Sequence, residues 1–150
     1  MQIRPMEPHE IDSVLTLFNY YREAADISEE RYSEDRARNT IREYCIRPNL
    51  FFRVAYTGQR PCGLIGGFLS EDPVDTERAA TIQFLYLLPE YDQQENYQQL
   101  IEQFSQWGRS AGASNCRAID IGNNTRRLEA VYAQLGFDPI RVSIMTREIA

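Results

Sequence analysis

The residues with the clearest chemical potential follow an apolar strand in the middle of the chain. Leu85 to Leu88 are apolar, Pro89 ends the strand, and a long amphipathic helix begins a few residues later. A helix N-terminus presents unpaired backbone N–H groups and the positive end of the helix dipole, which favours an anion such as phosphate. Two carboxylates in the same stretch, Asp92 and Glu95, oppose an anion, so the helix start carries conflicting signals.

Metal and disulfide chemistry are not indicated. His9 is the only histidine, and without a second His or a nearby Cys we expect no metal site. Cys45, Cys62 and Cys116 form neither an even set nor a C-x-x-C pair, so we expect buried free thiols in a reducing compartment. We therefore expect a cytoplasmic protein, an expectation that the lack of a basic, apolar leader in the sequence supports.

The composition argues against two classes of binding partner. The chain has 150 residues, 43% of them hydrophobic, and a formal net charge of −6. An acidic protein is not steered toward nucleic acid or an anionic membrane, so we expect neither as a partner. No apolar run approaches the roughly 20 residues that span a bilayer. The length is typical of one self-sufficient domain, predicted to cover residues 1–150.

Hydrophobic periodicity predicts about seven short strands and four helices in an α+β or α/β arrangement with a mixed sheet. The predicted helices are Ile11 to about Ala25, a segment capped by Ser33 and running through Cys45, a segment from the 92–97 turn to about Gly108, and one that carries Leu128 to Leu135. The predicted strands are Gln2 to Met6, Leu50 to Tyr56, Pro61 to Leu69, Arg78 to Leu88, Cys116 to Ile121, and two closing strands within Phe137 to Ile149. The glycines within the third strand predict a bend or a close backbone approach.

This order of elements resembles the GCN5-related N-acetyltransferase (GNAT) superfamily over essentially the whole chain. Four pieces carry the resemblance in order and spacing: Ile3 to Pro5, Cys62 to Gly67, Leu85 to Tyr91, and Val131 to Phe137. The resemblance implies a central, mostly antiparallel mixed sheet flanked by helices, with acetyl-CoA as the cofactor of active members.

The resemblance also implies a cofactor loop after the central strand. In the family, the backbone amides of a glycine-rich loop hold the pyrophosphate of acetyl-CoA, and an amide on the strand near Leu87 faces the acyl group. The six loop positions correspond to Asp92, Gln93, Gln94, Glu95, Asn96 and Tyr97. None of these matches the family's signature, and Asp92 with Glu95 forms a variant of the capping box that would satisfy the N–H groups a phosphate needs. We therefore expect a degenerate cofactor site.

Three further positions follow from the resemblance. Gln83 stands where many members carry a glutamate base, and an amide cannot accept a proton; a water-relayed base such as Glu77 is an alternative. Tyr132 matches the tyrosine that protonates the departing thiolate, or is a core tyrosine. Asn124, or its neighbour Asn123, matches an asparagine that contacts CoA.

Two functions remain open at this point. The first is a protein of this fold with a degraded acetyl-CoA site that acts as a protein-binding or structural component, with a protein partner or as a homo-oligomer. A faint likeness to short proteins of tailed phages extends this hypothesis to a virion location. The alternative is an active N-acyltransferase that uses acetyl-CoA with a non-standard loop on an unknown amine.

Overall fold

Five strands form one sheet in the order β1-β2-β3-β4-β5. The computed structural model describes residues 1–119, 125–139 and 145–149. The strands are β1 (Gln2–Arg4), β2 (Leu50–Thr57), β3 (Arg60–Glu71), β4 (Arg78–Leu87) and β5 (Asn115–Ala118). The first four pair antiparallel and β5 pairs parallel to β4. The predicted mixed, mostly antiparallel sheet is thus confirmed.

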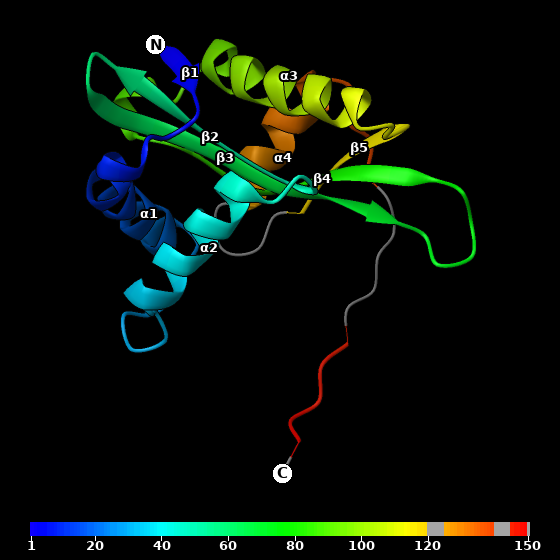
Figure 1. Ribbon diagram of the computed structural model, residues 1–150, viewed down its shortest axis with the longest axis horizontal. Helices are drawn as coiled ribbons and strands as arrows, with labels where there is room; N and C mark the ends of the chain where they lie inside the picture. The colour runs from blue at the N-terminus through cyan, green and yellow to red at the C-terminus, as the bar shows by residue number, and fades with distance from the viewer. Residues whose placement is uncertain (120–124, 140–144, 150) are drawn as a thin grey trace.

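Four α-helices and two short 3₁₀ turns accompany the sheet in the described chain. They are η1 (Pro8–Glu10), α1 (Ile11–Ala24), α2 (Glu34–Ile46), η2 (Pro89–Tyr91), α3 (Gln94–Ser110) and α4 (Thr125–Gln134). As predicted, the Ser33 side chain caps α2 by accepting a hydrogen bond from the Arg36 backbone N–H. Figure 1 shows α1 and α2 against one face of the sheet and α3 against the other.

Aromatic side chains fill both sides of the sheet. On the α1 and α2 side, the ring of Phe84 lies 5.3–5.8 Å from the rings of Phe18, Tyr21 and Tyr44. On the other side, Phe51 of β2 meets Phe104 and Trp107 of α3 at 5.4 and 5.1 Å. Edge-to-face and tilted pairs of this kind stabilise a fold beyond their buried area. Two helix layers are therefore fixed to the central strands by ring contacts.

A β-bulge interrupts the pairing of β3 with β4. Gly66 pairs with Phe84 and Gly67 with Ile82, so Gln83 has no partner residue on β3. A Cβ on Gly67 would lie 2.1 Å from the Thr81 carbonyl oxygen, closer than any real side chain allows. The predicted close backbone approach at these glycines is confirmed. The bulge therefore changes the course of β4 at Gln83, the position that the resemblance assigns to the base.

Two expectations need correction. About seven strands were predicted, but the described residues form a five-stranded sheet; the closing segment is non-strand at 137–139 and 145–149, and its residues 140–144 lie outside the described residues. Edge strands at a chain end depend on pairing partners that an alternating pattern does not specify. Cys62 is buried as predicted, but Cys116 is only half-buried and Cys45, in the last turn of α2, is exposed.

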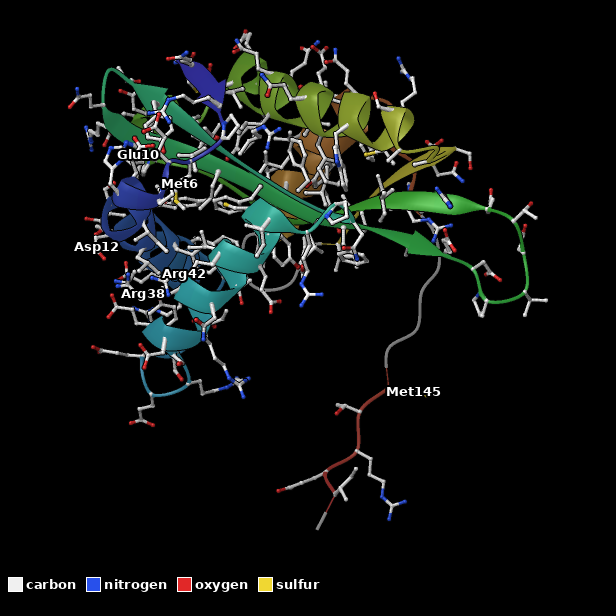
Figure 2. All side chains as sticks on the ribbon, in the orientation of Figure 1. Met6, Glu10, Asp12, Arg38, Arg42 and Met145 are labelled. Atoms are coloured by element: carbon white, nitrogen blue, oxygen red, sulfur yellow. The ribbon has the colours of Figure 1, made fainter. Side chains whose placement is uncertain are left out.

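Surface contacts join the first two helices. Arg38 of α2 donates a hydrogen bond at 2.9 Å to Asp12 of α1. Met145 near the C-terminal end is 92% exposed. Figure 2 labels these three side chains. Among the described helices, none is long and apolar enough to cross a membrane.

Candidate functional site

Within the described residues, the central strand β4 has a free edge along its second half. β5 pairs with β4 only from Ala79 to Ile82, and Ile119 then donates its backbone N–H to the Ile82 carbonyl at 2.9 Å. From Phe84 to Leu87, β4 pairs with β3 alone, and no strand within the described residues covers its other edge. A free strand edge offers alternating N–H and C=O groups to any extended ligand that carries amides.

The free edge leads into the start of α3 through η2. The Tyr91 and Asp92 backbone N–H groups donate to the carbonyls of Leu88 and Pro89 at 2.8 and 3.3 Å, so the chain closes a 3₁₀ turn first. Gln93 is then extended and is the N-cap of α3, without a side-chain capping bond. The predicted capping by Asp92 with Glu95 is therefore wrong, because the 3₁₀ turn moves the helix start one residue beyond Asp92.

The first turn of α3 presents backbone donors. Asn96 and Tyr97 donate their backbone N–H groups to the Gln93 carbonyl at 3.1 and 3.2 Å. The N–H groups of Gln94 and Glu95 have no backbone acceptor in the described part of the chain. Their direction and the helix dipole suit an anionic group. The predicted loop thus contains a helix start with two such donors, and two carboxylates accompany it.

Side chains of this loop mostly turn away from the helix start. Tyr97 is 2% exposed and belongs to the core, and the Asn96 amide donates to the Tyr91 carbonyl at 2.9 Å. Gln94 donates to the Val131 carbonyl of α4 at 3.2 Å, so the start of α3 lies beside α4. Of the two residues at the small-residue positions of the family's loop, Tyr97 therefore packs in the core, whereas Glu95 is exposed.

Acetyl-CoA carries groups that match the free edge of β4 and the start of α3. Its pantetheine arm carries amides that suit the free edge of β4, and its pyrophosphate suits the open N–H groups of Gln94 and Glu95. The adverse feature is charge, because a carboxylate about 5 Å from a phosphate costs on the order of 3 kcal/mol near a protein surface. Backbone geometry fits the cofactor, and the carboxylates of Asp92 and Glu95 weaken the fit.

Tyr132 of α4 is 7% exposed, and its ring lies 5.1 Å from that of Phe137. The ring packs in the core, as the core alternative expects, and α4 lies beside the α3 start. Leu87 ends β4 and is 2% exposed, so its side chain belongs to the core. Asn123 and Asn124 lie outside the described residues.

Gln83 has a partner that the sequence did not reveal. The Tyr44 hydroxyl of α2 donates a short hydrogen bond to Oε1 of Gln83. Burial raises the pKa of the Tyr44 phenol above its usual value, and the nearby Glu43 carboxylate raises it further. Because Tyr44 and Gln83 are 39 positions apart, no local pattern in the sequence signals this contact.

The alternative base, Glu77, is far from this point. It precedes β4, and six residues of extended chain separate it from Gln83, about 20 Å. Its carboxylate accepts a hydrogen bond from Asn115 at 2.9 Å instead. Glu77 therefore cannot serve the position of Gln83 directly.

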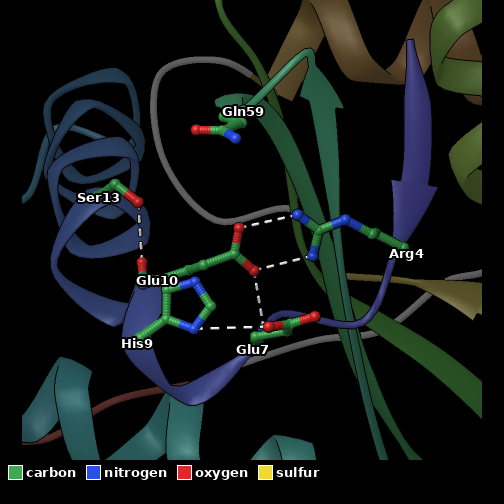
Figure 3. A pocket seen from close by; sticks show the side chains of 6 residues that line it. All are labelled: Arg4, Glu7, His9, Glu10, Ser13 and Gln59. Atoms are coloured by element: carbon green, nitrogen blue, oxygen red, sulfur yellow. Dashed lines mark hydrogen bonds and ion pairs between the residues drawn. The ribbon is translucent and has the colours of Figure 1, made fainter.

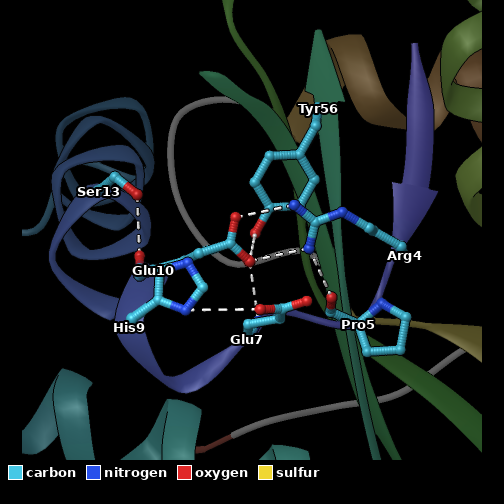
Figure 4. Close-up of polar contacts among 7 residues, drawn as sticks. All are labelled: Arg4, Pro5, Glu7, His9, Glu10, Ser13 and Tyr56. Carbon is cyan, nitrogen blue, oxygen red and sulfur yellow. Dashed lines mark hydrogen bonds and ion pairs between the residues drawn. The ribbon is translucent and has the colours of Figure 1, made fainter. Parts of the chain in front are cut away.

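A separate hollow of about 370 Å³ lies between β1 and α1, lined by Arg4, Glu7, His9, Glu10, Ser13 and Gln59 (Figure 3). Arg4 donates two hydrogen bonds to Glu10 at 2.8 Å, and Tyr56 donates a third at 3.2 Å (Figure 4). The Arg4 guanidinium also lies 3.8 Å from the centre of the Tyr56 ring. Hydrogen bonding to Arg4 lowers the pKa of Glu10 to about 2. These groups satisfy one another and join β1, β2 and α1.

Comparisons with known proteins agree with the fold. The model of the acetyltransferase (GNAT) family matches residues 14–137. Among solved structures, a probable acetyltransferase superposes with a TM-score of 0.79 at 20% identity, covering 100% of this chain and 99% of the other.

Two aminoglycoside N-acetyltransferases have similar structures. AAC(6')-Iy in complex with CoA has a TM-score of 0.81 at 19% identity, over 99% of this chain and 95% of the other. AAC(6')-Ih from Acinetobacter baumannii has a TM-score of 0.80 at 19% identity, over 99% of both chains. No curated protein matches the sequence.

Proposed function

Because the chain belongs to the acetyltransferase (GNAT) family, we propose that it is an N-acetyltransferase that uses acetyl-CoA and an amine acceptor. The observation that carries this proposal is the free edge of β4, which leads directly to a helix start without a side-chain cap. These two features suit the amides and the phosphates of the same cofactor. Solved structures of similar fold include aminoglycoside N-acetyltransferases, one of them with CoA.

Each part of the site has a role in this proposal. Acetyl-CoA, when bound, supplies the activated acetyl group. The free edge of β4 orients an extended ligand through backbone hydrogen bonds, and the N–H groups of Gln94 and Glu95 hold an anion. A backbone N–H near Leu87 stabilises negative charge on a carbonyl oxygen. Tyr132 holds the proton that the leaving sulfur takes.

A second candidate function is favoured by the carboxylates of Asp92 and Glu95. Together they oppose a pyrophosphate, and Gln83 cannot act as a base. In that case the fold serves as a protein-binding or structural component, with a protein partner or a second copy of the chain. A phage virion would be one setting for such a component.

Calorimetric titration with acetyl-CoA separates the two candidates. We expect saturable binding, and weaker binding of S-acetylpantetheine, because the latter has no pyrophosphate for the α3 start. Asp92→Asn removes one repulsive charge and is expected to tighten acetyl-CoA binding about a hundredfold at low salt. The matched control is Glu102→Gln, an exposed change two turns further along α3, which should leave affinity unchanged. Absence of binding at millimolar acetyl-CoA would favour the second candidate.

A further inference from the structure

The residue pair Gln83 and Tyr44 lies where β4 parts from β5. Pairing with β5 ends at Ile82, and Gln83 is the next residue and the bulged one. The hydroxyl of Tyr44 donates to Oε1 of Gln83, and the Tyr44 ring lies 5.6 Å from that of Phe84. At the point where the free edge of β4 begins, the amide of Gln83 therefore accepts a hydrogen bond from the neutral phenol of Tyr44.

Neither member of the pair can take a proton from an ammonium at neutral pH. An amide has no useful proton affinity, and it can only donate through Nε2 or accept through the remaining lone pair of Oε1. A phenol is a base only after it ionises, and burial keeps Tyr44 protonated well above neutral pH.

We propose that this enzyme does not deprotonate its acceptor at Gln83: the acceptor must arrive as a free amine, and Tyr44 positions Gln83 to hold it. The inference rests on the proposed acetyl transfer and adds a substrate class to it. Acceptors of low basicity are selected, such as α-amino groups, hydrazines and aryl amines, over strongly basic alkyl amines.

The proton balance of the step is complete without a protein base. The neutral nitrogen uses its lone pair to form the C–N bond to the acetyl carbon, and the C–S bond breaks. The sulfur keeps that electron pair and takes the proton held by Tyr132. The nitrogen gives its surplus proton to water, which returns one to Tyr132.

One carboxylate acts on Tyr44 itself, and others act on Tyr86 further along β4. Glu43 faces Tyr44 from α2 itself. Tyr86, two residues beyond Phe84 on β4, is influenced by Glu23 and Tyr20 of α1 and by Glu90 and Asp92 after β4. Glu23 lies 3.4 Å from Arg22, and Glu90 lies 3.8 Å from Arg60, so both carboxylates have ion-pair partners. Each of these carboxylates is a competing base that the experiment must test.

The size of the selectivity follows from the neutral fraction of the acceptor. At pH 7 about one in seven α-amino groups is neutral, against about one in 2,500 lysine-type amines, a ratio near 350-fold. The chain itself contains no lysine, so no lysine side chain of its own competes as an acceptor.

The test is the pH profile of kcat/KM for two acceptors, glycinamide and a more basic alkyl amine, with saturating acetyl-CoA. We expect each profile to rise tenfold per pH unit up to the pKa of its own acceptor. Gln83→Glu supplies a carboxylate at the same place. In this variant we expect the two pH profiles to rise with the same pKa, that of the new carboxylate, whichever acceptor is used. A shared ionisation in the unaltered protein would overturn the inference.

Controls separate this result from other causes. Glu23→Gln, Glu43→Gln and Glu90→Gln should leave the acceptor-dependent profile in place, and a profile lost in any of them identifies that carboxylate as a base.

Titration of Tyr44 by NMR of labelled tyrosine needs no cofactor: Gln83→Glu should raise the pKa of Tyr44, and an unchanged pKa contradicts the pairing. Turnover with a shared ionisation refutes this inference alone, whereas absent acetyl-CoA binding refutes the proposed function and the inference with it.

Discussion

Replacing Gly67 by alanine tests how β4 is shaped at the bulge. The added Cβ would lie 2.1 Å from the Thr81 carbonyl oxygen and 2.7 Å from the Phe104 ring. Neither neighbour can withdraw easily, because one is backbone of the adjacent strand and the other is a fully buried ring. Relief requires β3 and β4 to move apart by roughly 1 Å, a degree of overpacking that typically costs about 1–3 kcal/mol.

A matched control is available in the same strand. A Cβ on Gly63 would meet the Leu87 Cδ2 at 2.5 Å, and this is the far end of a flexible side chain. Alanine also reduces the entropy of the unfolded chain, which offsets part of any cost. In urea unfolding we expect a loss of about 2 kcal/mol for Gly67→Ala and less than about 1 kcal/mol for Gly63→Ala. Equal stability of the two variants would refute the close approach and the bulge register derived from it.

Two other changes test separate parts of the structure. The pKa of Glu10 is lowered from 4.5 to about 2, so its contribution is present above pH 4.5 and is lost as the pH falls toward 2. Glu10→Gln should remove about 2 kcal/mol at pH 7, allowing for solvent screening, and flatten the acid limb of stability measured by chemical denaturation; an unchanged acid limb would contradict the Arg4 contact. Tyr132→Phe should lower kcat about a hundredfold with little change in acetyl-CoA affinity, whereas equal loss of both would identify a packing residue.

Elements with a local signal could be predicted from the sequence. The apolar spacing of α1 and the Ser33 cap of α2 depend on residues within one or two turns, and the structure confirms both. Gly66 and Gly67 indicated a close approach, although not the register shift that leaves Gln83 unpaired.

The errors arose where local rules compete or where distant residues meet. Asp92 is a good capping residue, but the 3₁₀ turn that follows Pro89 uses its backbone N–H first, so the helix starts later. The contact of Tyr44 with Gln83 joins α2 to β4, and no short-range pattern encodes it. The degenerate site was predicted from the loop residues and stays a prediction, because it depends on how a bound phosphate would meet Asp92 and Glu95.

The most direct test of the central claim is amine-dependent release of CoA thiol. The purified protein is incubated with acetyl-CoA and glycinamide, free thiol is followed over time, and the acetylated amine is identified by mass spectrometry. The proposed function predicts thiol release that requires the amine and is matched by acetylated product. Thiol release at the uncatalysed rate, with no acetylated product from glycinamide or from a panel of other amines, would contradict it.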